Sequence, residues 1–249
     1  MSFPSDENQR QLFATAHQRL AAATAYRDWR DDVEDPNRPE TIQAMQMALH
    51  LPKQNPPARS EVLAAAAQAV LEVCLDPLAG GETAHAEALA QWYGRRIRKL
   101  ARRARNKAWE DIQMIPGATV NNMVRAFVPS AMDQVDPLIA KLQIGHTDME
   151  LDEPAPPCPE DPVIYVDAGL NMSAGKAAAQ VGHASMLLAG DMSLAEVQAW
   201  AQRDFALAVR EVPSEQFSEL CQGAVVVRDA GFTEVAPDSA TVCARRANV

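Results

Sequence analysis

Two segments near the end of the chain each combine an apolar strand with a polar loop. Residues 163–183 run from Val-Ile-Tyr-Val-Asp into Ala-Gly-Leu-Asn-Met-Ser-Ala-Gly-Lys, and residues 225–237 run from Val-Val-Val-Arg into Asp-Ala-Gly. In an open α/β sheet, binding crevices form where strands end and their loops meet. Lys176 and Asp229 would then come together, which predicts a site for an anionic substrate with acid–base chemistry.

The pattern after residue 163 alternates between strands and helices. Strand–helix–strand alternation predicts a sheet that is at least partly parallel. The last strand follows a loop without a helix, which predicts a mixed sheet. No internal repeat is visible between the two halves of the sequence. The predicted elements are strand 163–167, helices 173–189 and 193–202, strand 205–211, helix 214–222 and strands 224–228 and 240–245.

The first 115 or so residues have the spacing and alanine content of helices. Ser60 is the predicted N-cap of one of them. Short strands are predicted on either side of Asn121-Asn122, at 119–120 and 124–128. The predicted helices span about 7–29, 61–75 and 83–114, and 41–51 is a short amphipathic piece.

The predicted fold class is therefore an α/β C-terminal domain, with a mixed sheet of about four strands and flanking helices, preceded by a mainly α-helical N-terminal region. Five prolines within residues 151–162 favour an extended linker over a helix or a central strand. The predicted division is a helical region at 1–115, a mixed connecting segment at 116–150, this linker at 151–162, and the α/β domain at 163–249.

Composition narrows the classes of function. The net charge is −10 and the isoelectric point is near 5.0, whereas proteins that coat nucleic acid or anionic membranes are usually basic. The four cysteines are far apart and form no CxxC pair, which predicts free thiols and neither a zinc site nor a disulfide framework. No run approaches 18 apolar residues, so we expect a soluble, cytoplasmic protein without membrane contact.

The predicted helix after Ser173 carries Lys176, Gln180 and His183 on one face. A solvated polar face is the plain alternative, since periodicity alone assigns no chemistry. The Gly-Lys pair is not a phosphate-binding P-loop, because that motif needs four residues between its glycines and a Ser or Thr after the lysine. Here five residues separate Gly169 from Gly175, and an alanine follows Lys176.

Together these segments resemble the archaeal/eukaryotic-type peptidyl-tRNA hydrolase family, the second class of such enzymes. The motifs that carry the resemblance are Ser-Ala-Gly-Lys-Ala-Ala-Ala-Gln-Val-Gly-His-Ala at 173–184, Val-Pro-Ser at 212–214, and Val-Arg-Asp-Ala-Gly-x-Thr-x-Val-Ala-Pro at 227–237. The resemblance covers about 161–245 and looks like a branch with a long helical N-terminal extension. It implies hydrolysis of the ester between a nascent peptide and the 3′ ribose of tRNA.

The resemblance also implies the site residues, with no cofactor and no metal. The implied catalytic residues are Lys176, Asp229, Thr233 and Thr241, and the implied substrate-binding residues are Gln180, His183 and Ser239. By hypothesis Asp229 orients or deprotonates a water, Lys176 stabilises negative charge, and the two threonines position the water or the carbonyl. Two alternatives stay open: Lys176 as a phosphate contact only, and Asp229 as the residue of an Asx-turn.

The sequence departs from the family pattern within the second motif. Phe232 and Glu234 stand where the family usually has Arg and Gln, so a cation and a neutral donor are lost and an acid is gained. Near the end, Asp238-Ser239 replaces Gly-Thr. These departures favour a second reading, a non-catalytic tRNA- or RNA-binding protein.

Eight cations fall within thirteen residues of the predicted helix 83–114. Such a run could lie along the tRNA backbone and compensate for the acidic residues 161–249, or it could dock against the acidic cluster at 28–35 or another protein. A third reading is an adaptor whose N-terminal helices bind a protein partner or a second copy of the chain. The cations are Arg95, Arg96, Arg98, Lys99, Arg102, Arg103, Arg105 and Lys107.

Overall fold

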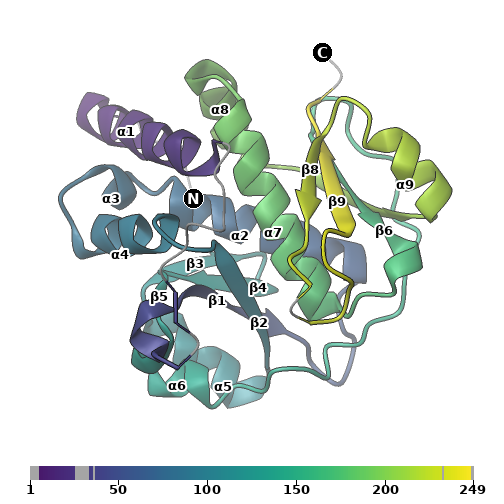
Figure 1. Ribbon diagram of the computed structural model, residues 1–249, viewed down its shortest axis with the longest axis horizontal. Coiled ribbons are helices and arrows are strands. Elements are labelled where there is room, and N and C mark those ends of the chain that lie inside the picture. Colours follow the sequence, from purple (N-terminus) through teal and green to yellow (C-terminus); the bar gives the residue numbers. More distant parts are fainter. Residues whose placement is uncertain (1–5, 26–33, 36, 232, 248–249) are drawn as a thin grey trace.

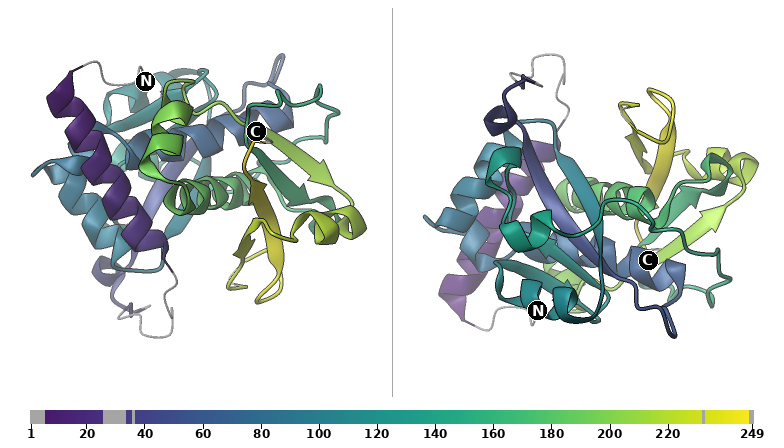
Figure 2. Two further views of the ribbon diagram at one scale, coloured as in Figure 1. Left: turned by 90° about the horizontal axis from the view of Figure 1, so that it is seen from above. Right: turned by 90° about the horizontal axis from the view of Figure 1, so that it is seen from below.

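The computed structural model describes residues 6–25, 34–35, 37–231 and 233–247. Two sheets lie on either side of a central pair of helices, α2 (Arg59–Cys74) and α7 (Ala174–Asp191) (Figures 1 and 2). Each central helix packs on the sheet of its own half, on the other central helix and on one edge strand of the other half. Within the described ranges, no helix is long and apolar enough to cross a membrane.

The C-terminal half confirms the predicted order of strands and helices. Its sheet has the order β7-β6-β9-β8, in which β6 and β7 are parallel and the other neighbours are antiparallel. The mixed sheet was predicted because β9 follows a loop and no helix. The bounds are β6 Val163–Asp167, α7 Ala174–Asp191, α8 Leu194–Ala201, β7 Ala208–Val212, α9 Ser214–Leu220, β8 Val225–Arg228 and β9 Ala240–Arg245.

The N-terminal region contains the predicted helices α1 (Glu7–Thr24) and α2, and it also contains a five-stranded sheet that the sequence analysis did not predict. The two short strands around Asn121-Asn122 are confirmed as β3 and β4. The main order is β2-β1-β4-β3, and β5 pairs with β1. The bounds are β1 Gln43–His50, β2 Arg98–Ala104, β3 Gly117–Val120, β4 Val124–Phe127 and β5 Ser130–Ala131. Short helices connect them: α3 Pro77–Gly80, α4 Ala84–Tyr93, α5 Asn106–Asp111 and α6 Pro137–Ala140.

The prediction of one long helix over 83–114 was wrong. The chain forms α4, ends it at Gly94, and then enters strand β2, which pairs in parallel with β1 over seven residues. Arginine, lysine, leucine and alanine favour helices in isolation. Here the backbone of β2 forms hydrogen bonds with the backbone of β1 along the whole strand. This long-range pairing outweighs the local preference for a helix.

The two halves have the same topology, although no repeat is visible in their sequences. In each half a first strand leads through a long helix to a parallel neighbour, and a later antiparallel hairpin adds two strands on the other side. Strands β1, β2, β3 and β4 correspond in order to β6, β7, β8 and β9, and α2 corresponds to α7.

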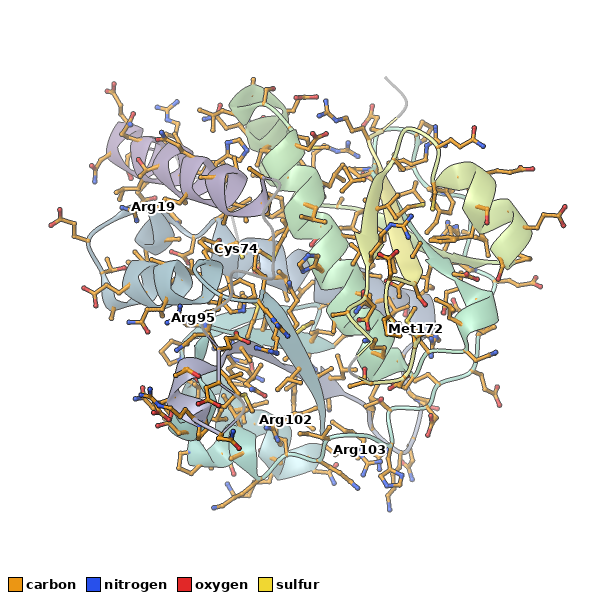
Figure 3. The ribbon with its side chains drawn as sticks, in the orientation of Figure 1. Arg19, Cys74, Arg95, Arg102, Arg103 and Met172 are labelled. Carbon is orange, nitrogen blue, oxygen red and sulfur yellow. The ribbon has the colours of Figure 1, made fainter. Side chains whose placement is uncertain are left out.

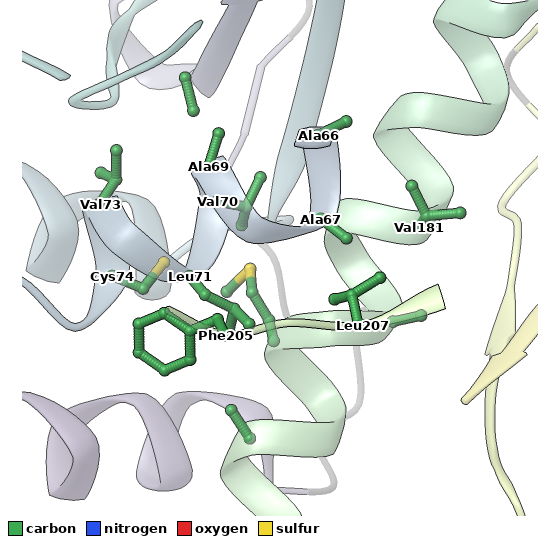
Figure 4. Close-up of a cluster of buried hydrophobic side chains, with 14 of the residues drawn as sticks. Ala66, Ala67, Ala69, Val70, Leu71, Val73, Cys74, Val181, Phe205 and Leu207 are labelled. Atoms are coloured by element: carbon green, nitrogen blue, oxygen red, sulfur yellow. The ribbon is translucent and has the colours of Figure 1, made fainter. Parts of the chain in front are cut away.

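Small apolar side chains let α2 and α7 approach closely. Figure 4 shows the alanines of α2 beside α7, which carries Val181, with Phe205 and Leu207 ahead of β7 in the same cluster. Ser185 Oγ donates a hydrogen bond to Ala67 O at 3.0 Å, so the helix contact is polar as well as apolar. A helix that buries almost all of one long face needs this tight packing, since core voids are destabilising. The buried residues of this cluster that Figure 4 labels are Ala66, Ala67, Ala69, Val70, Leu71, Val73, Cys74, Val181, Phe205 and Leu207.

The predicted linker, residues 151–162, contains no helix or strand, and hydrogen bonds join it to Ser60 in the first half and to Arg210 in the second half. Ser60 donates to Asp152 through both its backbone N and its Oγ, at 2.8 and 2.6 Å. Ser60 therefore lies inside the first turn of α2, and the observed N-cap is Ala58. Asp152 supplies the carboxylate that a capping side chain would otherwise provide.

We expect Gly182→Leu to destabilise the protein by disturbing the contact between the halves. A methyl group on Gly182 would lie 2.8 Å from Val70 Cγ2. Overpacking of this kind costs about 1–3 kcal/mol. Urea unfolding should show a lower midpoint for Gly182→Leu, and Val70→Ala in the same chain should restore part of the loss. Equal midpoints for Gly182→Leu and the wild type would contradict the tight contact.

Candidate active site

The site begins where β6 leads into α7. Ser173 is the N-cap of α7, and its Oγ accepts from Lys176 N at 3.2 Å, as its position before the helix predicted. Lys176 and Gln180 are one turn apart and point from the same face. Asp229 follows β8, just after an irregularity in its pairing with β9 at Val227/Arg228. Such irregularities redirect the residues that follow.

Four of the predicted residues form one hydrogen-bonded group. Lys176 Nζ lies 2.5 Å from Asp229 Oδ2, and Gln180 Nε2 donates to the same oxygen at 2.8 Å. Thr241 Oγ1 donates to Gln180 Oε1 at 2.6 Å. The chain Thr241–Gln180–Asp229–Lys176 fixes which amide atom of Gln180 faces Asp229, because the other one is already an acceptor.

This group is exposed at one end only. Thr241 is fully buried, whereas the side chains of Lys176 and Asp229 are 11% and 10% exposed. The ammonium and the carboxylate therefore have some contact with solvent, whereas the threonine hydroxyl has none. Burial of an ion pair is tolerated when further hydrogen bonds satisfy its atoms, and Gln180 and Thr241 meet that condition here.

The loop that carries Asp229 is closed at its neck. Asp229 Oδ1 accepts from Gly231 N at 2.8 Å, which is the Asx-turn considered as an alternative, and its backbone O accepts from Asp238 N at 2.7 Å. Gly231 has φ +79° and lies against Pro237, where a side chain would collide with the proline ring. Asp229 N donates to Ser239 O at 2.9 Å, so Ser239 holds the aspartate through its backbone.

Glu234 contacts the site helix, a role that the sequence analysis missed. Its carboxylate accepts from Ser173 N at 2.8 Å and from Ser173 Oγ at 2.7 Å. A carboxylate is stabilised by the positive end of the helix dipole. The position was conspicuous only as a departure from the family pattern, and its partner depends on how the loop folds back. Thr233 is exposed in the same loop, and Phe232 lies outside the described residues.

His183 lies away from this group, between the two halves. Its Nδ1 is 3.2 Å from Lys99 Nζ on β2. Burial, reinforced by the Lys99 charge, lowers the pKa of His183 to about 3. Burial likewise lowers the pKa of Lys99 to about 7, while Lys99 Nζ also stands 4.9 Å from the centre of the Trp92 ring. His183 therefore faces the N-terminal half and does not contact Asp229.

Most of the eight predicted RNA-binding cations have structural partners. Lys99 and Arg102 are buried, and Arg102 is bonded to Gln46 and to the backbone O of Leu142, which makes a phosphate contact at these two unworkable. The remaining six lie nearer the surface. Figure 3 labels two of these six, Arg95 and Arg103, together with the buried Arg102. The partners of the six include Glu34 for Arg98, Gln143 and His146 O for Arg103, Leu51 O for Arg105 and Asp111 for Lys107, while Arg95 and Arg96 are half-buried before β2.

The Arg98–Glu34 ion pair agrees in part with the alternative that the cations dock against the acidic cluster at 28–35. Residues 28–33 of that cluster lie outside the described residues. All four cysteines are free thiols, as predicted. Among the described residues, no group of three or more His, Cys, Asp or Glu side chains is arranged to hold a metal ion.

Comparison with known proteins agrees with the motif resemblance. The model of the family described as peptidyl-tRNA hydrolase PTH2 matches residues 162–246, which is about a third of the chain and nearly all of the C-terminal half. The matched region contains the whole Thr241–Gln180–Asp229–Lys176 group. No curated protein and no solved structure matches the chain. Residues 162–246 are thus a region similar to a peptidyl-tRNA hydrolase.

We expect Thr241→Val to destabilise the protein more than Thr241→Ser, which keeps the hydroxyl and loses one buried methyl group. Valine has the shape of threonine and suits a strand, but it leaves the buried Gln180 Oε1 without its donor. An unsatisfied buried polar atom costs about 1–3 kcal/mol. Urea unfolding at pH 7 measures both variants, and a Thr241→Val protein as stable as the wild type would show that Gln180 does not depend on this hydroxyl.

We expect Lys99→Met to flatten the rise of stability with pH above 7. Burial lowers the pKa of Lys99 to about 7 in the folded protein, whereas a lysine exposed in the unfolded chain has a pKa of about 10.4. The unfolded state binds more protons in this window, so stability increases with pH by up to about 1.4 kcal/mol per unit. Unfolding free energies at pH 7 and pH 9 should differ more for the wild type than for Lys99→Met. The same difference in both proteins would contradict a buried, easily deprotonated Lys99.

Proposed function

We propose that residues 163–245 hydrolyse the ester bond of peptidyl-tRNA and release peptide and free tRNA. The observation that supports this most is the state of the Asp229 carboxylate. It has roughly four acceptor positions, and three are used by Lys176, Gln180 and the Gly231 amide. One position on Oδ1 remains for a water molecule, while the Lys176 ammonium is bonded to Oδ2 of the same carboxylate.

Asp229 then orients the attacking water through Oδ1, because Lys176 and Gln180 both occupy Oδ2. The water oxygen forms a bond to the ester carbonyl carbon, and Lys176 Nζ stabilises the negative charge that develops on the carbonyl oxygen. The bond from carbon to the ribose oxygen breaks, and that oxygen takes up the proton from water. The peptide leaves as a carboxylate and gives its remaining proton to solvent. An aminoacyl ester is labile, so positioning and charge stabilisation are sufficient.

Gln180 and Thr241 act on this chemistry indirectly, by holding Asp229 in position. Thr241 is fully buried and holds Gln180, which in turn holds Asp229. We therefore assign Thr241 a positioning role in place of the direct contact that the sequence analysis proposed. Thr233 is exposed in the loop and is the threonine that can contact substrate. His183, which faces Lys99, has no place in substrate binding in this proposal.

The tRNA has to approach an acidic half of the protein, so cations from the first half are useful to it. Arg103 is the best placed of the eight. It is partly exposed and donates to His146 O, and the next residue, Thr147, accepts from Gly175 N in the first turn of α7. We propose phosphate contacts for Arg103 and the other surface cations, and none for Lys99 and Arg102.

We expect Asp229→Asn to reduce peptide release from an N-blocked aminoacyl-tRNA by about 100-fold or more, the cost of losing one preorganised group at the reacting atoms. The amide keeps the shape but loses the charge that orients the water and pairs with Lys176. Affinity for the tRNA, measured by filter binding, should change little. Asp191→Asn is the matched control, because Asp191 pairs with Arg246 at the far end of α7.

Each other result of the same assay points to a different function. Unchanged turnover in Asp229→Asn would overturn the assigned site. A wild type that binds tRNA in a salt-sensitive way without turnover is the behaviour of a non-catalytic RNA-binding protein. Absence of both binding and turnover favours an adaptor that acts through the N-terminal helices.

A further inference from the structure

The packing between the two halves is reciprocal. When α2 and α7 are aligned at their first residues, Arg59 and Ala174, Ala67 corresponds to Gly182 and Val70 corresponds to Ser185. Ser185 donates to Ala67 O, and Gly182 lies against Val70. The ninth residue of each helix thus contacts the twelfth residue of the other. A contact in which i meets j and j meets i is the signature of a twofold interface between two copies of one fold.

The next position along each helix repeats the relationship. The tenth residue of α7, His183, meets Lys99 on strand β2, and the tenth residue of α2, Gln68, donates to Phe205 O at 3.3 Å, just before strand β7. Strands β2 and β7 are themselves equivalent in the two sheets. The side chains differ, but in both cases the central helix of one half contacts the equivalent edge strand, or the residues just before it, in the other half.

The first half lacks the site that the second half contains. Glu61 and Ala65 occupy the positions of Lys176 and Gln180 on the equivalent helix. The loop that carries Asp229 spans residues 229–239 between β8 and β9, whereas residues 121–123 alone join β3 to β4. The same fold is present without the cation, the amide or the aspartate loop.

The first half nevertheless reaches the entry to the site helix. Arg59, the first residue of α2, is 4% exposed and donates to Glu211 on β7 at 2.6 and 3.0 Å. Its Nη2 also donates at 2.8 Å to the backbone O of Met172, the residue just before the N-cap Ser173. The alanine at the equivalent place on α7 cannot return such a contact. Arg59 therefore breaks the twofold symmetry, because the first half contacts the site helix of the second half and receives no equivalent contact in return.

We propose that residues 39–142 are a built-in partner subunit, a second copy of the hydrolase-like fold without a site, and that Arg59 from this copy positions the site helix α7. The chain then works as a monomer with one site, because α2 and β2 of its own first half already cover the inner face of α7. The role of Arg59 rests on the proposed function, whereas the built-in subunit does not.

The test uses the full chain with both members of the buried pair replaced. Arg59→Met alone leaves Glu211 buried without its partner, which is strongly destabilising, whereas Arg59→Met with Glu211→Met removes both charges. Arg102→Met with Gln46→Met is the matched control, because Arg102 is a buried arginine whose partners all lie in the first half. Light scattering gives the mass in solution, and hydrogen exchange with mass spectrometry gives the protection of residues 168–180.

The wild type should have the mass of one chain, 27.1 kDa. The Arg59/Glu211 double variant should remain a monomer, exchange faster over 168–180, and lose about tenfold in kcat with little change in KM, since a positioning defect of this size corresponds to about 1.4 kcal/mol. The Arg102/Gln46 double variant should leave exchange over 168–180 and kcat unchanged.

A stable dimer of the wild type would overturn the built-in subunit. Unchanged exchange over 168–180 in the Arg59/Glu211 variant, or the same change in both double variants, would overturn the role of Arg59. Mass and exchange are measured without a substrate. A protein that has no hydrolase activity but gives the expected mass and exchange would refute the proposed function and leave the built-in subunit supported.

Discussion

The contact between α2 and α7 is the interaction on which the rest of the structure depends. Each helix covers the inner face of its own sheet, and each would expose a long apolar surface if the other half were absent. Burial of that surface contributes roughly 25 cal/mol for each Å² removed from water. Alanines and glycines at the contact allow the close approach, which brings the edge strand of each half within reach of the helix of the other. The two sheets therefore form a single body around one shared core.

The same contact determines which polar groups are available for chemistry. It buries Lys99 against His183 and ties Arg59 to Glu211, so these charges serve the interface. Nearer the start of α7, Lys176 and Gln180 remain together at the end of the second sheet, where the loop after β8 delivers Asp229. One helix thus separates a structural set of charges from a reactive set. Glu234 places a second carboxylate at the N-terminus of α7. Its negative charge weakens the attraction that the helix dipole would otherwise exert on an anion there.

The C-terminal half could be predicted almost element by element. Its strands and helices alternate with clear breaks, and strands β6 and β9 have the predicted bounds. The meeting of Lys176 with Asp229 was also predictable, because both follow strands of one sheet. The N-terminal sheet was not predictable in this way. Strand β2 consists largely of residues that favour helices, and its strand form depends on pairing with β1, which is about fifty residues earlier in the sequence.

The sequence by itself determined the local order of the second half and the identity of the residues that could react, because short-range apolar patterns and turn residues act within a few positions of the chain. The tertiary structure alone decided which of those residues meet. It turned His183 toward Lys99, placed Thr241 behind Gln180, folded Glu234 back onto Ser173, and revealed one topology repeated in two dissimilar sequences. These outcomes depend on contacts between residues far apart in the chain, whose free energies arise only when the two sheets close around α2 and α7.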